Sequence, residues 1–596
     1  MPVYVAVDLG PESGRVLTGE FDGERLAVRE VHRFANRPVR VLDGMYWDVL
    51  GLLTQTRGGI ALAASRGRLT SVGVTAWGGD FALLDRAGRL LANPRHHLDP
   101  YTSGLAGLVS WQDHYELTGV RPGPGTTACQ LLAHAGSPLL DAADHLAMMP
   151  DLFTLWLSGE MLAERTIAST SQLLDARTGR WADSLVTRLG LPHHLFAHRL
   201  AEPGTVAGPL RDGGDGGGGG GGGVRVSRNG RGPGATMVVA VAGHDAASAA
   251  AALPVSAGSV GYISCGPRSL AGLELDAPVT SRAARLAGFT NEGGVMGTVR
   301  FTRALNGLTL LQECRRAWGL RASYADLVAE AATTPAFGPL IDPGHPWFLE
   351  PGNIPARIAA YCRSTGQAPP EDRAQTVRCV LESLACSYRW ALEQAEFLGD
   401  RRVEAVHLVG GGAASAAFCG LVADFAGRPV LAGPVEATAV GNLLVQAMAD
   451  GRLGSLTELR EVVRRSFRPR PFAPAARREP YEIAYSRYRR LTGIDGFWND
   501  AAPEPRPGNE HRARPARHAA SAPSDPSAPS APSVTPAAPG PPAVPVTSTT
   551  PATSTSATTS VGLAGDRVAA GTDEEVQVGA PVGLHHMVDV EAFPAP

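Results

Sequence analysis

Short apolar runs that end in glycine or in an acidic residue recur along most of the chain. The first run occupies residues 3–9; it contains Asp8 and is followed by Gly10 and Gly14. Its β-branched residues predict a strand, and the glycines predict a turn into a second strand rather than into a helix. Such a hairpin either is purely structural or presents backbone N–H groups to a phosphate while Asp8 holds a hydrated Mg²⁺.

Strands and helices alternate in the rest of the first third of the chain. The apolar periodicities predict, in order, a strand at 26–34, a helix at 47–65, a buried parallel strand at 69–77, a strand at 82–85 and helices from about 108 to 200. The strand at 69–77 leads into Gly78, Gly79 and Asp80. Open α/β folds bind ligands at the carboxyl ends of parallel strands, so Asp80 is a candidate ligand-binding residue. A simple turn cap is an equally consistent role for it.

A second block with the same pattern starts at residue 236. It is predicted to contain strands at 236–242, 258–265 and 403–409, helices between about 270 and 400, and helices at 246–253, from about 414, and at 437–448. Gly243, His244 and Asp245 follow the first of these strands. The last strand ends in three consecutive glycines, where the backbone can approach a flat or anionic ligand closely.

Two segments differ sharply in composition from these blocks. Residues 211–233 include an unbroken glycine run, and residues 500–596 consist largely of Pro, Ala, Ser and Thr with few aromatics. Neither composition supplies apolar side chains to a core, so we expect a flexible insertion and a disordered tail. The remaining length is too great for a single core and predicts two domains.

Charge and cysteine content exclude several classes of protein. A net charge of −3 gives no reason to expect binding to nucleic acid or to an anionic membrane. The chain contains no lysine, which excludes mechanisms built on a P-loop lysine, a Schiff base or a Ser–Lys pair. The seven cysteines show no CxxC spacing, so neither a zinc site nor a disulfide framework is indicated. The start of the chain lacks a signal-peptide pattern, and we expect a cytoplasmic protein.

A series of short motifs runs in order through residues 3–480. The motifs are Val7-Asp8-Leu9-Gly10 with Ser13-Gly14-Arg15, Trp77-Gly78 with Asp80-Phe81, Met149-Pro150-Asp151, Gly243-His244-Asp245, Asn291-Glu292-Gly293-Gly294, Val409-Gly410-Gly411-Gly412, and Ala432-Gly433-Pro434-Val435-Glu436. Each motif is weak alone. The ordered series resembles the FGGY family of carbohydrate kinases, which share the fold of actin, hexokinase and Hsp70.

This resemblance implies an α/β fold with two ribonuclease H-like (actin-like ATPase) domains around an interdomain cleft. The N-terminal domain, residues 1–242, would hold the sugar side and the first phosphate hairpin. The C-terminal domain, residues 243–485, would hold the general base and the adenosine side. The implied activity is phosphorylation of a ketose hydroxyl, such as the 1-hydroxyl of L-rhamnulose, by ATP with Mg²⁺. The expected partners are therefore a small sugar and ATP.

The resemblance also implies roles for individual residues. Asp245 would accept the proton of the sugar hydroxyl, a role that competes with that of N-cap for the following helix. Gly78, Asp80 and His244 would contact the sugar. Asp8 would hold Mg²⁺ through water. The expected nucleotide-binding residues are Gly10, Ser13, Gly14, Arg15, Gly266, Pro267, Gln312, Gly410, Gly411 and Gly412.

The chain departs from the family pattern mainly on the nucleotide side. Pro11 and Glu12 replace small residues in the first loop, and Glu12 would bring a negative charge close to phosphate. Pro267 removes a hydroxyl and an N–H from the second phosphate turn, where Arg268 would be a substitute phosphate ligand. The other departures are Ala304 and Ser415 in place of asparagines, and Leu98-Asp99-Pro100-Tyr101 in place of Arg-Asp-Ser-Arg. They open a second hypothesis, a kinase-fold protein that binds a sugar or a partner without efficient phosphoryl transfer.

Overall fold

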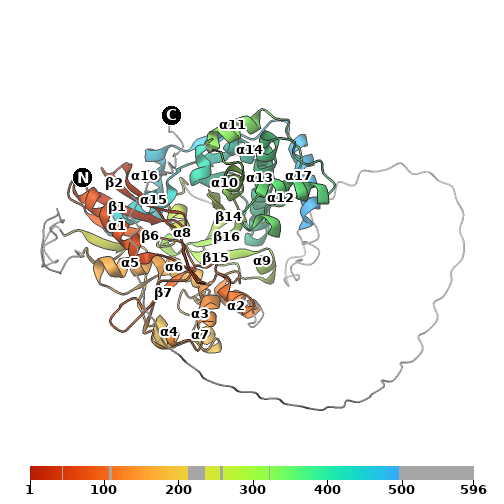
Figure 1. Ribbon diagram of the computed structural model, residues 1–596. Helices are drawn as coiled ribbons and strands as arrows, with labels where there is room; N and C mark the ends of the chain where they lie inside the picture. Colours follow the sequence, from red (N-terminus) through yellow and green to blue (C-terminus); the bar gives the residue numbers. More distant parts are fainter. Residues whose placement is uncertain (43, 106–110, 212–234, 256–259, 321, 495–596) are drawn as a thin grey trace, which may run out of the picture. The chain divides into compact units, whose positions relative to one another are not determined.

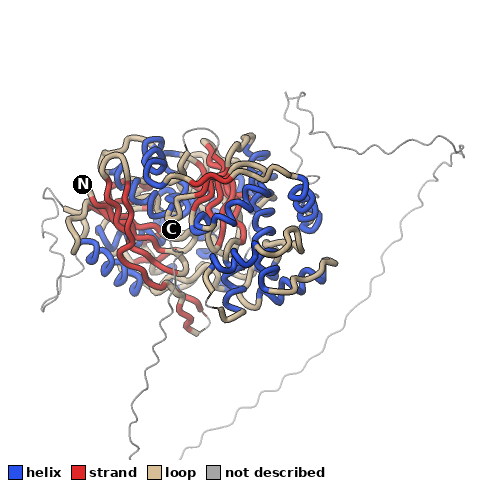
Figure 2. The backbone as a smooth tube through the Cα atoms, turned by 90° about the horizontal axis from the view of Figure 1, so that it is seen from above, coloured by secondary structure: helices blue, strands red, loops and turns tan. Residues whose placement is uncertain are grey.

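Two β-sheets with helices packed beside them organise the described residues, and Figures 1 and 2 show the strands gathered into these two groups. The computed structural model describes residues 1–42, 44–105, 111–211, 235–255, 260–320 and 322–494. All of them lie in one compact unit. The predicted insertion, from residue 212 on, and the predicted tail at 500–596 fall outside the described residues.

The first sheet has the strand order β11-β12-β6-β1-β2-β3. Its strands are β1 Val3–Leu9, β2 Ser13–Phe21, β3 Leu26–Ala35, β6 Ser71–Thr75, β11 Thr205–Pro209 and β12 Met237–Ala240. β1 pairs antiparallel with β2 and parallel with β6, which confirms the opening hairpin and the buried parallel strand. Because β1 and β6 are parallel, their carboxyl ends meet at one edge of the sheet.

The second sheet has the strand order β15-β16-β14-β13-β17-β18-β19. Its strands are β13 Val260–Cys265, β14 Arg268–Leu275, β15 Phe289–Gly293, β16 Val299–Asn306, β17 Val406–Val409, β18 Val430–Ala432 and β19 Arg470–Phe472. β17 lies between β13 and β18 and is parallel to both. The strands predicted at 258–265, as far as it is described, and at 403–409 are thereby confirmed.

Two stretches that the apolar pattern predicted as helical contain strands. β8 His145–Met148 pairs with β7 Phe81–Leu84, and β14, β15 and β16 precede the long helices of the second block. The helical prediction for 108–200 and for 270–400 is wrong at these strands. β16 forms antiparallel ladders with both β14 and β15, and this long-range pairing overrides the local apolar spacing.

Helices surround both sheets. They are α1 Val49–Ala64, α2 Trp111–Thr118, α3 Thr127–Ala133, α4 Pro138–Asp141, α5 Met149–Ser158, α6 Arg165–Ala168, α7 Asp183–Arg188, α8 Asp245–Ala251, α9 Arg282–Leu286, α10 Thr309–Ala317, α11 Tyr324–Ala332, α12 Ile354–Ser364, α13 Arg373–Gly399, α14 Ala416–Ala426, α15 Ala437–Ala449, α16 Leu456–Phe467 and α17 Glu479–Thr492. Short strand pairs add β4 Val39–Val41, β5 Gly44–Tyr46, β9 Ala163–Glu164 and β10 Leu200–Ala201. Within the described residues, none of these helices combines the length and the apolar character that crossing a membrane requires.

Helix α15 fastens the second half of the chain to the first sheet. Its Gln446 side chain donates to the Val5 carbonyl of β1 at 2.9 Å and accepts from the Ser71 hydroxyl of β6 at 2.7 Å. On another face α15 packs against α8 so closely that a Cβ at Gly441 would lie 1.8 Å from the Ser248 carbonyl oxygen. Only glycine fits this crossing. A single apolar core therefore connects β1, α8 and α15.

Candidate active site

The turn at residues 243–245 joins the first sheet to α8. The Asp245 N–H donates to the Ala76 carbonyl at 3.0 Å, and the Ala76 N–H donates to the Gly243 carbonyl at 2.9 Å. Ala76 directly follows β6, so the turn continues the carboxyl edge of the first sheet as a parallel bridge to His244. The turn therefore lies at the sheet edge where α/β folds bind ligands.

Asp245 is the first residue of α8 and does not serve as its N-cap. The N-cap position belongs to His244, which makes no side-chain capping hydrogen bond. The Asp245 carboxylate accepts at 2.5 Å from the N–H of the next residue, Ala246, and about a third of its side chain is exposed. Burial raises the pKa of Asp245; His244 partly offsets this rise, and the charge of Asp8 adds to it. A carboxylate with a raised pKa is a better proton acceptor.

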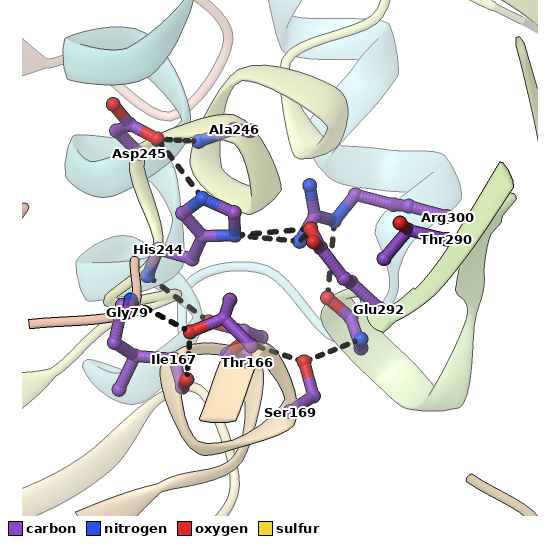
Figure 3. A network of polar contacts seen from close by, with 12 residues as sticks. Gly79, Thr166, Ile167, Ser169, His244, Asp245, Ala246, Thr290, Glu292 and Arg300 are labelled. Atoms are coloured by element: carbon purple, nitrogen blue, oxygen red, sulfur yellow. Dashed lines mark hydrogen bonds and ion pairs between the residues drawn. The ribbon is translucent and has the colours of Figure 1, made fainter. Parts of the chain in front are cut away.

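A polar network surrounds His244 (Figure 3). Its Nε2 lies 3.3 Å from an Asp245 carboxylate oxygen, and its Nδ1 lies 2.8 Å from Nη2 of Arg300. The same Nη2 donates to Glu292 at 2.8 Å. Burial would raise the pKa of Glu292, but the charge of Arg300 acts against this rise, and the pKa is lowered to about 2. The polar contacts therefore run without a break from Asp245 through His244 and Arg300 to Glu292. The carboxylate of Glu292 at the end of this series is negatively charged.

A second buried glutamate holds the same turn through its backbone. Glu164 accepts from the Gly243 N–H at 2.9 Å and from the Thr166 hydroxyl at 2.6 Å, and that hydroxyl accepts from the His244 N–H at 3.2 Å. Burial raises the pKa of Glu164 to about 7. Asp151 lies beside it, and burial and the Glu164 charge raise the pKa of Asp151 well above its ordinary value. These contacts fix the backbone from which Asp245 projects.

Asp8 is the penultimate residue of β1 and lies near the same turn. Its Oδ2 accepts from Arg15 of β2 at 2.6 Å, and the Thr75 hydroxyl of β6 lies 3.4 Å from its Oδ1. Arg15 also pairs with Glu436, which precedes α15. Burial lowers the pKa of Arg15, but the two carboxylates outweigh it and raise the pKa overall. Arg15 thus links the hairpin to the second half of the chain, a role that the sequence did not predict.

The hairpin loop is held closed by its own backbone and by one buried side chain. The Gly10 N–H donates to the Ser13 carbonyl at 3.0 Å, and the Asn36 amide donates to the Gly10 carbonyl at 2.8 Å. A Cβ at Gly14 would lie 2.2 Å from the Phe34 ring, so a larger residue there would displace that ring. Asn36 follows the end of β3 and is distant in sequence from Gly10, so no local pattern indicates that it supports this loop.

Asp80, which the sequence predicted to contact the sugar, is enclosed by hydrogen-bond donors. Asp80 is completely buried, and its Oδ2 accepts from the Trp47 indole at 2.7 Å, the Trp77 indole at 2.9 Å and the His97 imidazole at 2.9 Å. Its Oδ1 accepts from the Gln130 amide at 3.0 Å. A carboxylate with four donors orients the side chains that surround it. Burial would raise the pKa of Asp80, but His97 and the indole N–H groups lower it.

Arg95 supplies a cation beside residues 98–101, where the family pattern has two arginines that this chain lacks. It pairs with the buried carboxylate of Asp99 at 2.9 Å, and its guanidinium lies 4.2 Å from the ring centroid of Tyr101. The Tyr101 hydroxyl donates in turn to Gln130 at 2.7 Å. Gly78 borders the same region, where a Cβ would lie 2.9 Å from the Thr170 hydroxyl. Arg95 stands outside the family's Arg-Asp-Ser-Arg spacing, which is why motif matching missed it.

The expected nucleotide-binding glycines meet at the end of β13. A Cβ at Gly410 would lie 2.9 Å from the Cys265 carbonyl oxygen, and one at Gly412 would lie 2.3 Å from the Cys265 sulfur. Gly410 also has a φ of +83°, which favours glycine. The Gly410 N–H donates to Pro434 at 3.2 Å, in the segment that leads to Glu436. The glycine turn, the end of β13 and the Arg15–Glu436 ion pair are therefore neighbours.

The turn after β13 packs on helix α10. The Leu308 N–H donates to the Gly266 carbonyl at 2.9 Å, and the Thr309 hydroxyl donates to the Pro267 carbonyl at 2.7 Å. A threonine hydroxyl is therefore present at this turn although Pro267 removed the expected one. Gln312 lies one helical turn further along α10 and hydrogen bonds with Tyr324 of α11.

Glu12 and Arg268 do not pair in the part of the chain that the structure describes. Both side chains are exposed, and their ion pair is absent among the described residues. Burial raises the pKa of Tyr324, and the charge of Glu12 contributes to the rise. The charge of Glu12 is therefore close enough to act on Tyr324 of α11, the hydrogen-bond partner of Gln312.

Comparison with known proteins assigns both halves of the chain to the same family. Residues 3–230 match the N-terminal domain of the FGGY family of carbohydrate kinases, and residues 261–449 match its C-terminal domain. A rhamnulokinase of Bacteroides thetaiotaomicron is 38% identical over 478 residues, which are 79% of this chain and 96% of that protein. A rhamnulokinase of Enterococcus faecalis is 34% identical over 472 residues, 78% of this chain and 92% of that protein.

Solved structures show the same fold. The xylulose kinase from Rhodospirillum rubrum covers 83% of this chain and all of its own, with a TM-score of 0.65 and 18% identity. The Plasmodium falciparum glycerol kinase with ADP covers 84% of this chain and 97% of its own, with a TM-score of 0.63 and 14% identity. The fold is thus the α/β actin-like ATPase fold that the sequence predicted. With both family domains present in order and relatives matched over nearly their whole length, this chain belongs to the FGGY family of carbohydrate kinases.

Proposed function

We propose that this carbohydrate kinase transfers the terminal phosphate of ATP to the 1-hydroxyl of L-rhamnulose. The identity of its relatives supports the substrate, since rhamnulokinases match 78–79% of the chain at 34–38% identity. The observation that carries the chemistry is the placement of Asp245. Its partly exposed carboxylate stands at the carboxyl edge of the first sheet, next to Asp8, and its pKa is raised.

Asp245 would orient the sugar hydroxyl and accept its proton as the phosphorus–oxygen bond forms. Phosphoryl transfer asks little covalent chemistry of a protein and depends on positioning and charge stabilisation. The raised pKa of Asp245 improves its match to the hydroxyl proton, and the contacts of the 243–245 turn to Glu164 and Thr166 keep its position fixed. His244 would contact the sugar on the same side.

Mg²⁺ fits this site as an ion held mainly through water. Among the described residues no three His, Cys, Asp or Glu side chains cluster into a direct metal site. Asp8 offers one carboxylate, of which Oδ1 has only a 3.4 Å contact to the Thr75 hydroxyl. Mg²⁺ commonly keeps several waters and uses one or two protein carboxylates. When bound, it would neutralise charge on the phosphates of ATP.

ATP would lie along the segments that converge near Cys265. The hairpin residues Gly10, Ser13, Gly14 and Arg15 would face the β- and γ-phosphates, with the turn at Gly266 and Pro267 opposite. Gly410, Gly411 and Gly412 would receive the adenosine, with Gln312 nearby. In this arrangement the boundary at residues 242–243 separates a sugar-side domain from an adenosine-side domain, although α15 crosses back to the first sheet.

The family match does not support the hypothesis of a protein that binds without phosphoryl transfer. Two observations also weaken the reasons for that hypothesis. Thr309 brings a hydroxyl to the turn where Pro267 lost one, and Arg95 brings a cation to the sugar side. Glu12 remains the main departure. The variant Glu12→Ser removes its charge, and we expect a several-fold lower Kd for Mg²⁺-ATP by calorimetry. An unchanged Kd would show that Glu12 points away from the phosphates.

A panel of sugars tests the substrate. We expect the purified full-length protein with Mg²⁺-ATP to release ADP when L-rhamnulose is added, more slowly with L-fuculose or D-xylulose. Carbon-13 and phosphorus-31 spectra of the product should place the phosphate on carbon 1. ADP release with another sugar alone would correct the substrate, and no release with any of the three would remove the assignment as a ketose kinase.

A further inference from the structure

Arg300 contacts the Nδ1 side of the His244 ring, whereas Asp245 lies on the Nε2 side. It belongs to β16, pairs across the ladder with Glu292 of β15, and its side chain is completely buried. Its Nη2 reaches both Glu292 and His244 Nδ1 at 2.8 Å, and its Nε donates to the Gly293 carbonyl at 3.1 Å. Figure 3 shows Arg300 and Glu292 together at one end of the His244 ring and Asp245 at the other.

These distances determine which ring nitrogen of His244 carries a proton. A guanidinium stays protonated in proteins and only donates hydrogen bonds. His244 Nδ1, at 2.8 Å from Nη2, must therefore be an acceptor without a proton. The carboxylate of Glu292 would favour a proton on Nδ1, but it lies further away, at 3.4 Å. The remaining nitrogen, Nε2, then carries the only ring proton.

This tautomer directs a donor at Asp245. Nε2 lies 3.3 Å from Asp245 Oδ1, so a proton on Nε2 is close enough to attract the carboxylate. The opposite tautomer would place a lone pair against the carboxylate, which would repel it. Glu292 completes the arrangement, because its negative charge and the Gly293 carbonyl hold the guanidinium in one orientation.

We propose that Arg300 is a positioning residue that holds His244 as the neutral Nε2–H tautomer, so that this N–H orients the carboxylate of Asp245. The inference deepens the proposed function and rests on it for the kinetic consequence. The tautomer itself is a property of the free protein. It is therefore tested by a readout that needs neither the right sugar nor any activity.

Nitrogen-15 spectroscopy of ring-labelled histidine tests the tautomer in the full-length protein at pH 7. The signals of His244 are assigned as those that disappear in His244→Gln. We expect one protonated nitrogen with the shift typical of Nε2 and one unprotonated nitrogen typical of Nδ1. In Arg300→Gln we expect a mixture of tautomers or the imidazolium. An imidazolium or an Nδ1–H tautomer in the unmodified protein would overturn the proposal without any variant.

Two further variants separate positioning from folding. Arg300→Lys keeps a cationic donor and should retain most of the Nε2–H form. Arg303→Gln is the matched control: Arg303 lies on the same strand, is half-buried, donates to the Ala287 carbonyl and stacks 4.3 Å from the Trp390 ring centroid. We expect it to lose stability but to leave the His244 signals unchanged. Equal spectra for Arg300→Gln and the unmodified protein would contradict the inference.

Kinetics measures the consequence for the reaction. If L-rhamnulose is the substrate, Arg300→Gln should lower kcat roughly 100-fold through misorientation of Asp245, with the KM for ATP unchanged and partial rescue in Arg300→Lys. A loss of kcat equal to that of Arg303→Gln would assign Arg300 a merely structural role. If no sugar is phosphorylated by the unmodified protein, the proposed function fails, whereas the nitrogen-15 spectrum still decides this inference.

Discussion

Two glutamates support the 243–245 turn, and their pKa values are shifted in opposite directions. Glu164, between β9 and α6, has a pKa raised to about 7 by burial. Glu292, on β15, has a pKa lowered to about 2. Glu164 faces N–H and O–H donors and a second carboxylate, Asp151. Glu292 faces Arg300.

The difference shows what a cation partner does to a carboxylate near this site: Arg300 offsets the burial of Glu292, whereas the hydrogen-bond donors around Glu164 do not offset its burial. On the Glu292 side the fixed charge holds Arg300 and, through it, the ring of His244. On the Glu164 side the hydrogen bonds hold backbone N–H groups, which a neutral acid can still accept. The Glu292 side therefore acts through charge, and the Glu164 side acts through hydrogen-bond geometry. Substitutions on the two sides should change the stability of the protein differently.

The largest effect is expected from Glu292→Gln, which leaves the Arg300 guanidinium buried without its carboxylate. Removing one partner of a buried ion pair costs about 3–5 kcal/mol. Urea unfolding at pH 7 measures the loss, with the exposed Glu404→Gln as control. A loss below about 1 kcal/mol, no larger than that of the control, would mean that the ion pair does not hold the region together.

The pH dependence of stability should separate the two glutamates next. The pKa of Glu292 is lowered from 4.5 to about 2, so its contribution is complete above pH 4.5 and disappears as the pH falls toward 2. A shift of this size corresponds to about 3 kcal/mol. The stability difference between the unmodified protein and Glu292→Gln should shrink over this window. A difference independent of pH would contradict the assigned charge.

Glu164→Gln should show the opposite sign. Because the pKa of Glu164 is raised from 4.5 to about 7, the folded state favours the protonated acid, and stability from this group falls as the pH rises between these values. The neutral amide avoids this loss while it can still accept from the Gly243 N–H. Between pH 4.5 and 7, the free energy of unfolding of Glu164→Gln should rise by about 1–3 kcal/mol relative to that of the unmodified protein. If the stability of Glu164→Gln instead fell steadily relative to the unmodified protein as the pH rose, Glu164 would be ionised in the folded protein.

The smallest effect is expected from Thr166→Val, which removes the hydroxyl between Glu164 and the His244 N–H. A buried N–H that loses its acceptor costs about 1 kcal/mol or slightly more. Thermal unfolding measures this loss, and Thr187→Val, at an exposed hydroxyl, is the control. Because the Thr166 hydroxyl donates to Glu164 and lowers its pKa, we expect that pKa to rise further in Thr166→Val and the loss of stability with rising pH to extend to higher pH. An unaltered pH dependence would mean that the hydroxyl holds the turn without influencing the charge of Glu164.

The fold was largely accessible from the sequence because local patterns carry it. Asp8 and Gly10 after a β-branched run gave the hairpin, and the strand before Gly410 gave the parallel core of the second sheet. The strands β8 and β14 to β16 were missed, because antiparallel pairing with distant strands, and not local spacing, fixes them.

The candidate site was accessible only where a motif names it. Asp245, His244 and Asp8 stand in motifs, whereas Arg300 follows its motif by several residues and is recognisable only once the β15–β16 ladder sets it opposite Glu292. Asp80 stands in a motif as well, yet only the structure shows that four donors enclose it. Spacing along the chain carries no information about contacts that tertiary packing creates.

The central claim is that Asp245 accepts the proton of the sugar hydroxyl. It is tested most directly by single-turnover phosphoryl transfer from Mg²⁺-ATP to L-rhamnulose in Asp245→Asn, with sugar binding measured by calorimetry and the exposed Asp276→Asn as control. We expect Asp245→Asn to bind the sugar but to lose transfer by at least roughly 1,000-fold, and Asp276→Asn to match the unmodified protein. Transfer by Asp245→Asn within about tenfold of the unmodified rate would contradict the account.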